Sequence, residues 1–244
     1  PVTSPLVVTI ANIKGGVGKT TTGWMLARHL VARRSVLLVD MDPHAHLTRA
    51  TGVAANTNIG HVLGGANNPS ASLRSAARIG NHDIPIVPAN LDLANVAHGL
   101  HNRMFDRFNA LANAIAATGS DWHTIIIDAP ANADILTINA LAAANTVVIP
   151  CQPEPASIEA LRATIRLIDQ VRQAMHRADE PCHLRTVITL ADERTNQHRD
   201  GIQRIQETAP NYTCTIPRRN GESADADLFA AYAPLATSLE EIRC

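Results

Sequence analysis

Short runs of aliphatic and β-branched residues alternate along the chain with longer segments whose apolar residues recur every three or four positions. This alternation is typical of β-strands separated by α-helices. Because the short runs are continuously apolar, we expect strands buried on both faces of a parallel sheet, with helices covering each face. The predicted strands are 6–11, 36–40, 84–88, 124–128, 146–150, 184–190 and 212–217.

The predicted helices lie between these strands, at 20–33, 101–117, 134–144, 156–177 and 197–208. The clearest is 156–177, where Ile158, Leu161 and Ile165 share one face at the helical period. Glycine and asparagine cluster at 56–68, which predicts a loop. We find no internal repeat and no interdomain linker. The pattern therefore predicts one α/β domain over 1–244, with a single doubly wound, mostly parallel sheet flanked by helices.

Composition narrows the function classes. The chain has 244 residues, of which 45% are hydrophobic and 3% aromatic, so we expect an aliphatic core under small-residue helices. No apolar run approaches the roughly 18 residues that a membrane span needs, and no export signal is recognisable. The four cysteines contain no CxxC pair, which favours free thiols in a reducing cytoplasm over a zinc site or a disulfide framework.

The charges are unevenly distributed. Net charge is −1 with a pI near 7.0, which argues against a protein that coats nucleic acid through bulk charge. Of the 21 basic residues only two are lysines, and both Lys14 and Lys19 lie in one glycine-rich loop. We infer that this loop requires ammonium groups rather than guanidinium groups.

That loop has the pattern of a phosphate-binding loop. Residues 14–22 read KGGVGKTTT, directly after a predicted strand and before a predicted helix. Glycines let backbone N–H groups point at phosphate oxygens, and the helix N-terminus adds partial positive charge. We expect Lys19 to reach the β- and γ-phosphates of ATP and the Thr20 hydroxyl to bind Mg²⁺. The predicted ATP-binding residues are Lys14, Gly15, Gly16, Val17, Gly18, Lys19, Thr20 and Thr21.

The loop departs from the usual GxxxxGKS/T pattern at its first position, which is Ile13, with Lys14 next. This deviant Walker A motif resembles that of the ParA/MinD family of ATPases. The resemblance implies that Lys14 reaches across a dimer interface to the partner's nucleotide. There it would supply positive charge during phosphoryl transfer, in the manner of an arginine finger. Lys14 and Lys19 are therefore both predicted to be catalytic.

Two acidic segments follow the strands. Asp40 and Asp42 are two residues apart, which places them on one face at the end of strand 36–40, where ligands of α/β sheets bind. The family pattern here is D-x-D-P-Q-x-N. It implies that Asp42 orients the attacking water and that Asp40 lies near the Mg²⁺. His44 and His46 replace the glutamine and asparagine, which leaves open a separate zinc or iron site.

The run TIIID, ending at Asp128, has the form of a Walker B strand. We expect Asp128 to hold Mg²⁺ through a water molecule. In the family this segment continues as D-x-P-P, and here Ala131 replaces the second proline.

Further segments of the chain resemble the same family in the same order. They are residues 86–94 (IVPANLDLA), 147–155 (VVIPCQPEP), 189–196 (TLADERTN) and 216–219 (IPRR). The last implies an adenine pocket lined by the backbone of Pro217, Arg218 and Arg219. The match is closest to the short ParA/Soj-type partition ATPases. It implies a cytoplasmic MgATP-dependent homodimer with ATP at the interface and slow hydrolysis until a partner stimulates it.

Such proteins position plasmid or chromosome DNA together with a ParB-like centromere-binding protein, and bind DNA non-specifically when loaded with ATP. The resemblance implies that Arg194 contacts DNA and that the ATP-bound protein associates with the nucleoid. The family's second DNA-contacting arginine falls on Gly221, which leaves as alternatives Arg219, our first choice, and Arg162 and Arg166, one turn apart on the predicted helix 156–177.

Other functions share this loop. MinD-like proteins bind membranes through a basic amphipathic C-terminal helix, whereas this sequence ends in SLEEIRC, so we expect no membrane partner. Nitrogenase-type iron proteins need cysteines near 128–145, and none is present. An ATP-dependent ligase or synthetase on the same fold, and a nucleotide-binding adaptor without turnover, remain as alternatives. The acidic residues Asp42 and Asp128 favour turnover over the adaptor.

Overall fold

The computed structural model describes residues 4–55, 58–64, 73, 78–118, 121–209, 211–218 and 224–242. At its centre is an eight-stranded sheet with the strand order β3-β4-β2-β5-β1-β6-β7-β8. All neighbouring strands are parallel except β3 and β4, which are antiparallel. The strands are β1 (Leu6–Ile10), β2 (Val36–Asp40), β3 (Arg78–Ile79), β4 (Pro85–Val87), β5 (Thr124–Asp128), β6 (Thr146–Cys151), β7 (His183–Ala191) and β8 (Tyr212–Pro217).

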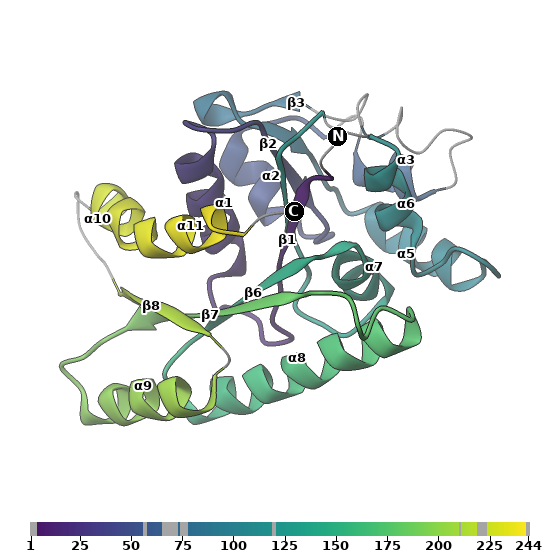
Figure 1. The fold of residues 1–244 in the computed structure, drawn as a ribbon. Helices are drawn as coiled ribbons and strands as arrows, with labels where there is room; N and C mark the ends of the chain where they lie inside the picture. The colour runs from purple at the N-terminus through teal and green to yellow at the C-terminus, as the bar shows by residue number, and fades with distance from the viewer. Residues whose placement is uncertain are drawn as a thin grey trace.

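Helices cover both faces of the sheet (Figure 1). One face packs against α1 (Lys19–Leu30), α2 (His46–Thr51), α10 (Ala224–Ala231) and α11 (Ala233–Glu240). The other packs against α3 (Ile59–Leu63), α5 (Leu93–His101), α6 (Ala110–Ala116), α7 (Ile135–Ala143), α8 (Pro155–Ala174) and α9 (Asn196–Thr208). A short 3₁₀ helix, η1 (Asn81–Asp83), precedes β4. The predicted doubly wound α/β fold is confirmed.

The central strands are buried along their whole length, as their continuous apolar sequence predicts. The connections from β1 to β2 and from β5 to β8 run toward opposite edges of the sheet, so a crevice forms at the carboxyl ends of β1, β2 and β5. In this register Asp128 pairs with Ile10 on one side and with Asp40 on the other. The sheet itself therefore brings two of the predicted acidic residues together.

The predicted helix 101–117 is wrong in its first half. The structure ends α5 at His101 and begins α6 at Ala110. Between them, the carbonyl of Arg107 accepts a hydrogen bond from the Asn139 side chain at 2.7 Å, which comes from α7. A tertiary contact therefore uses a backbone group that a continuous helix would need.

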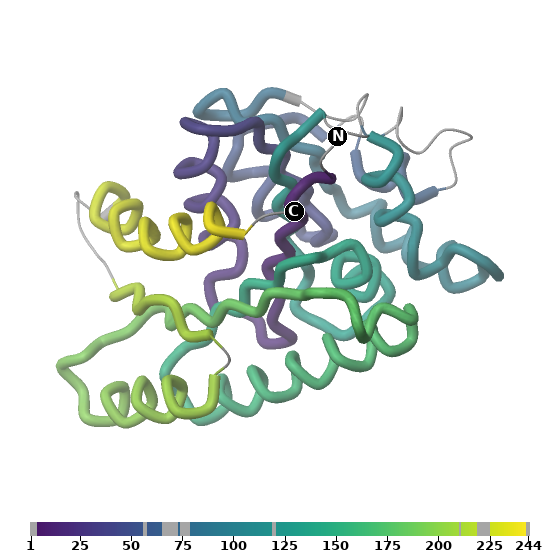
Figure 2. The backbone as a smooth tube through the Cα atoms, in the orientation of Figure 1, coloured from purple at the N-terminus to yellow at the C-terminus, as the bar shows by residue number. Residues whose placement is uncertain are grey.

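The predicted loop 56–68 is also corrected, because it contains α3. Asn58 caps α3 by accepting from the backbone N–H of Gly60 at 2.8 Å, and the side chain of Ile59 is buried in the core. Near the other end of the chain, α10 and α11 were not predicted. Figure 2 shows them (yellow) beside α1 (purple), and α11 contacts both α1 and β8.

The thiols in the described residues are free, as predicted. Burial raises the pKa of Cys151 to about 12 and that of Cys214 to about 11. Both are therefore protonated and unreactive at neutral pH. Cys244 lies outside the described residues.

Candidate functional site

A cleft of about 760 Å³ opens at the carboxyl edge of the sheet. Its residues come from two groups that are far apart in sequence. The first is the β1–α1 loop with the segments after β2 and β5, and contributes Gly15, Gly16, Gly18, Lys19, Thr20, Thr21, Asp42, His44, His46 and Ala131. The second belongs to β7, β8 and α10–α11, and contributes Thr189, Leu190, Ile216, Pro217, Asp225, Leu228 and Tyr232.

The glycine-rich loop curls around its second lysine. Gly16 and Gly18 have φ angles of 74° and 85°, a left-handed conformation that favours glycine over residues with a side chain. α1 begins directly after Gly18, so its free N–H groups face the cleft. The Lys19 ammonium donates a hydrogen bond to the carbonyl of Lys14 at 3.1 Å. Burial lowers the pKa of Lys19, against the charges of Asp128 and Asp42, which raise it.

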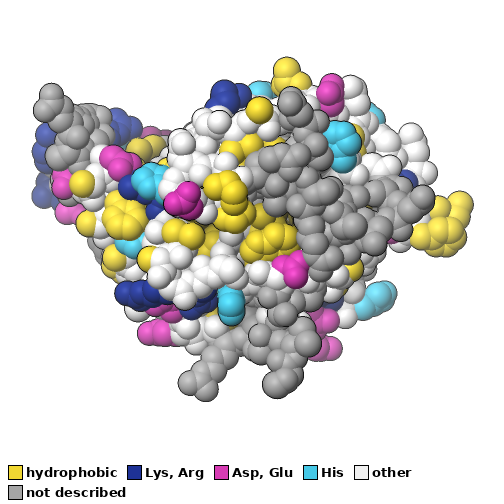
Figure 3. Space-filling model, turned by 90° about the horizontal axis from the view of Figure 1, so that it is seen from above, with side chains coloured by type: hydrophobic (Ala, Val, Ile, Leu, Met, Phe, Trp, Pro, Cys, Tyr) yellow, Lys and Arg dark blue, Asp and Glu magenta, His cyan; other side chains and the backbone are white. Residues whose placement is uncertain are grey.

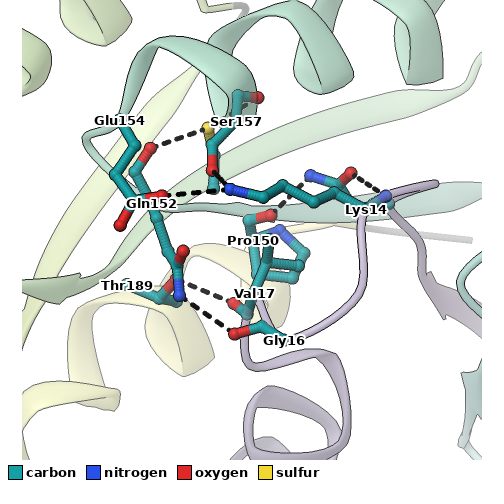
Figure 4. Close-up of polar contacts among 10 residues, drawn as sticks. Lys14, Gly16, Val17, Pro150, Gln152, Glu154, Ser157 and Thr189 are labelled. Carbon is teal, nitrogen blue, oxygen red and sulfur yellow. Dashed lines mark hydrogen bonds and ion pairs between the residues drawn. The ribbon is translucent and has the colours of Figure 1, made fainter.

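Two neighbouring strands hold this loop in place. The Thr189 hydroxyl donates to the carbonyl of Val17 at 2.8 Å, and the Gln152 side-chain amide donates to that of Gly16 at 2.9 Å (Figure 4). Both residues belong to segments already matched to the family pattern, but neither was predicted to support the loop. These hydrogen bonds attach two carbonyls of the loop to β7 and to the segment that follows β6.

The acidic residues Asp40 and Asp128 have different partners. Asp40 accepts hydrogen bonds from the backbone N–H and the hydroxyl of Thr48, at 2.9 and 2.7 Å. Among the described residues, Asp128 accepts one side-chain hydrogen bond, from the Thr20 hydroxyl at 2.7 Å. Its other oxygen, Oδ1, is buried and has no hydrogen-bond partner within the part of the chain that the structure describes.

Burial raises the pKa of both carboxyls, that of Asp128 to about 8, and the charge of Asp40 adds to the effect at Asp128. A buried carboxylate oxygen without a partner, next to a hydroxyl, is a donor set suited to Mg²⁺, which prefers oxygen ligands. Thr20 and Asp128 therefore fit the predicted metal. Asp40 is already engaged by Thr48, which fits an indirect role.

Asp42 lies at the rim of the cleft beside two histidines. Its Oδ1 atom accepts from the backbone N–H of His44 at 2.9 Å and lies 3.0 Å from Nδ1 of the same residue. The rings of His44 and His46 are stacked, with centroids 6.0 Å apart. Within the described ranges, no group of three or more His, Cys, Asp or Glu residues could hold a metal ion. The separate zinc or iron site therefore gains no support.

Lys14 folds back onto its own chain. Its ammonium donates to the Ser157 hydroxyl at 2.6 Å and forms an ion pair with Glu154 at 3.1 Å, both at the start of α8 (Figure 4). The two lysines therefore have different surroundings: the Lys19 ammonium contacts the loop itself, and that of Lys14 contacts the start of α8.

The other end of the cleft is mostly apolar. Pro217, which the sequence predicts to lie beside the base, lines this end together with Leu228 and Tyr232, which were not predicted. The Tyr232 hydroxyl lies 2.9 Å from that of Thr22 in α1, so α10 and α11 are tied to the loop's own helix. The feature of the sequence that could have predicted α10 and α11 is the spacing of apolar residues in its last segment. Arg218 is exposed and donates its backbone N–H to Ala191, and Arg219 lies outside the described residues.

Arg194, the predicted DNA contact, forms two side-chain hydrogen bonds with Asp192, at 2.8 and 2.9 Å, while its side chain remains 89% exposed. The pair lowers the pKa of Asp192 to about 2. The described chain contains no helix that is both long enough and apolar enough to cross a bilayer.

A parallel sheet whose first strand leads through a glycine-rich, lysine-containing loop into a helix, beside a buried acid at the end of β5, defines a P-loop nucleoside triphosphatase fold. Residues 6–179 match a family model described as an AAA domain. The sporulation initiation inhibitor protein Soj of Bacillus subtilis is 33% identical over 221 residues, covering 87% of this chain and 84% of that protein. The chain belongs to the ParA/Soj family of chromosome-partitioning ATPases.

Two solved structures have the same fold. Cobyrinic acid a,c-diamide synthase from Mycobacterium smegmatis, with bound ADP and magnesium, has a TM-score of 0.84 and 32% identity, covering 97% of this chain and 94% of that one. A plasmid partition protein from Borrelia burgdorferi has a TM-score of 0.80 and 24% identity, covering 98% of this chain and 100% of that one. At this identity the second likeness concerns the fold alone.

Proposed function

We propose that the protein is a partition ATPase that binds MgATP, dimerises with ATP at the interface and hydrolyses it slowly until a partner stimulates it. In the cytoplasm it would bind DNA non-specifically and position a plasmid or chromosome with a ParB-like protein. The observation that carries this proposal is the arrangement of Lys19, Thr20 and Asp128 at one edge of the sheet. They provide a buried cation, a hydroxyl and a carboxylate oxygen that has no hydrogen-bond partner among the described residues.

Within this proposal each charged residue has a separate task. Lys19 and the loop N–H groups would bind the β- and γ-phosphates, and Thr20 and Asp128 would hold Mg²⁺, whose charge would offset that of the phosphates. Asp42, at the rim of the same cleft, orients the attacking water. Lys14 acts in the partner subunit's site, which requires it to leave Glu154 and Ser157.

The base of ATP would lie at the apolar end, on Pro217 and the neighbouring backbone, between β8 and α10. Leu228 contributes apolar contact there. A mostly apolar pocket with few polar groups is the usual environment of an adenine-sized ring.

DNA binding is proposed for Arg194, with Arg219 as the second contact. Arg194 would exchange Asp192 for a phosphate, since its guanidinium is exposed. On the face shown in Figure 3, acidic side chains lie among the basic ones. Residues 151–244 carry more acidic than basic side chains, so we expect few phosphate contacts, about four to six per dimer, and a slope of log affinity against log salt of roughly −4 to −5. Arg194→Ala should reduce that slope by close to two units, and an unchanged slope would remove Arg194 from the DNA surface.

The decisive experiment measures ATP turnover with MgATP alone, with random-sequence duplex DNA, and with DNA plus the DNA-binding protein encoded beside this gene. We expect slow turnover that rises when both are present. Asp42→Ala should lower turnover by about 100-fold or more and trap the ATP-bound dimer, detected by light scattering. Undiminished turnover, or a monomer, would contradict the role given to Asp42.

An ATP-dependent synthase is the second candidate, because the structure of cobyrinic acid a,c-diamide synthase is similar over 97% of the chain. Absence of ATP-dependent DNA binding at low salt would favour it. A MinD-like membrane function is less well supported. The apolar residues Leu235 and Leu239 of α11 are fully buried in the core, so α11 offers no apolar face to a membrane.

A further inference from the structure

We propose that His44 positions the carboxylate of Asp42 for ATP hydrolysis. The family pattern has glutamine at this position, so the imidazole is a feature of this chain. Both residues line the cleft. The inference rests on the proposed ATPase function and adds a positioning residue to it.

The two carboxylate oxygens of Asp42 differ in their hydrogen-bond partners. Oδ1 accepts from the backbone N–H of His44 at 2.9 Å and from its ring Nδ1 at 3.0 Å. An ionised carboxylate only accepts hydrogen bonds, so Nδ1 must carry the proton. Oδ2 accepts no hydrogen bond from any residue that the structure describes, which leaves it for a water molecule. His44 thus fixes which oxygen faces the reacting water.

The turn that carries both residues is itself held in a specific conformation. The carbonyl of Asp42 accepts from the N–H of Ala45 at 2.8 Å, and Ala45 has a φ of 54°. A left-handed conformation is uncommon for a residue other than glycine and is found preferentially at functional sites. The Arg49 side chain donates to the carbonyl of His44 at 2.5 Å, and the His44 ring stacks on that of His46.

The exposure of His44 and Asp42 distinguishes a positioning role for His44 from a purely structural one. The His44 side chain is 75% exposed, whereas that of Asp42 is 17% exposed. An imidazole so exposed adds little to the core, so its removal should leave the fold intact. Its hydrogen bond nevertheless limits rotation of the Asp42 carboxylate. Because Lys19, Thr20 and Asp128 bind the phosphates and metal independently, losing His44 should reduce kcat rather than ATP affinity.

The test compares His44→Ala with His44→Asn, whose amide nitrogen can donate from about the position of Nδ1. We expect His44→Ala to lower kcat by about five- to tenfold with KM for MgATP within about twofold, and His44→Asn to restore most of kcat. His98→Ala is the matched control, because it removes an exposed imidazole from α5, outside the cleft. Unchanged kcat in His44→Ala, or no rescue by His44→Asn, would overturn the proposal.

A double-mutant cycle then tests whether His44 acts through Asp42. In an Asp42→Ala background, single-turnover measurements should show no further loss on adding His44→Ala. An equal loss in both backgrounds would overturn the positioning role. The failure of the proposed function is distinguishable: wild-type protein that hydrolyses no MgATP, with or without DNA and partner, overturns that function and this inference together, whereas turnover unaffected by His44→Ala overturns only the inference.

Discussion

The two ends of the cleft are built in different ways. At the end where we propose that the phosphates bind, the phosphate end, the lining is charged and comes from the turns that follow β1, β2 and β5, with Lys19, Asp42 and Thr20 around the loop. At the end where we propose that the base binds, the base end, the lining is mostly apolar and comes from β8 and α10–α11, with Pro217 and Leu228. About 200 residues separate Lys19 from Leu228 in the sequence, yet α10 packs against both α1 and β8.

Because of this difference, we expect the two ends to contribute unequally to the free energy of nucleotide binding. A buried ammonium that faces phosphates makes charge-assisted hydrogen bonds, which are about twice as strong as neutral ones. An apolar contact contributes to the binding free energy in proportion to the apolar area that it removes from water, at roughly 25 cal/mol per Å². Substitutions at the phosphate end should therefore abolish activity, and those at the base end should only weaken nucleotide affinity.

The largest effect is expected for Lys19→Gln. This change removes the main positive charge on the β- and γ-phosphates, so ATP affinity should fall by at least about 100-fold. Titration of a fluorescent ATP analogue measures it. Arg33→Gln is the control, because the Arg33 side chain is 69% exposed, pairs with Glu240 and lies outside the cleft, so its removal should leave this binding intact. Affinity within about twofold of wild type in Lys19→Gln would refute the phosphate-loop assignment.

Lys14→Arg should follow, with turnover reduced about tenfold or more despite the retained charge. A planar guanidinium does not reproduce a compact ammonium, and it can pair bidentately with Glu154, which would hold it on its own chain. Turnover and MgATP-dependent dimerisation test this together. Wild-type behaviour in both assays would mean that no specific requirement for lysine exists at this position.

At the base end, Leu228→Ala should weaken ATP and ADP binding equally, by about three- to tenfold, because it removes apolar contact with the base and leaves the phosphates untouched. Leu91→Ala is the matched control, since Leu91 is 74% exposed and lies outside the cleft. Isothermal titration with each nucleotide provides the comparison. A loss confined to ATP would contradict the assignment of Leu228 to the base end.

The smallest effect is expected for Tyr232→Phe. The Thr22 hydroxyl donates its single proton to the carbonyl of Gly18 at 2.8 Å, so Tyr232 must donate to Thr22. Removing this buried hydrogen bond should cost about 1 kcal/mol, or about 2–4 °C in Tm for a chain of this length, with ATP affinity nearly unchanged. Tyr212→Phe removes a half-buried bond to Thr215 and should shift Tm less. A larger Tm change at Tyr212 would contradict this ranking.

Local sequence patterns predicted most of the strands and helices. The wrong predictions share one cause, which is that contacts with distant parts of the chain override the local pattern. Strands such as β1 and β5 were predicted because their sequences are short runs of aliphatic and β-branched residues, and the structure buries all five residues of each. The helix predicted at 101–117 failed because Asn139, from α7, binds the carbonyl of Arg107. The loop predicted at 56–68 failed because the core buries Ile59 and makes a short helix favourable.

The sequence by itself determined the phosphate loop and the order of the acidic strand ends, because the left-handed turns at Gly16 and Gly18 and the position of Asp128 are local properties. Only the tertiary structure decided which atoms the loop and the acidic residues contact. The hydrogen bond from Thr20 to Asp128, the contact of Lys14 with Glu154 and that of Thr22 with Tyr232 join segments 100 or more residues apart. Such contacts depend on how whole elements pack, and no short stretch of sequence encodes that packing.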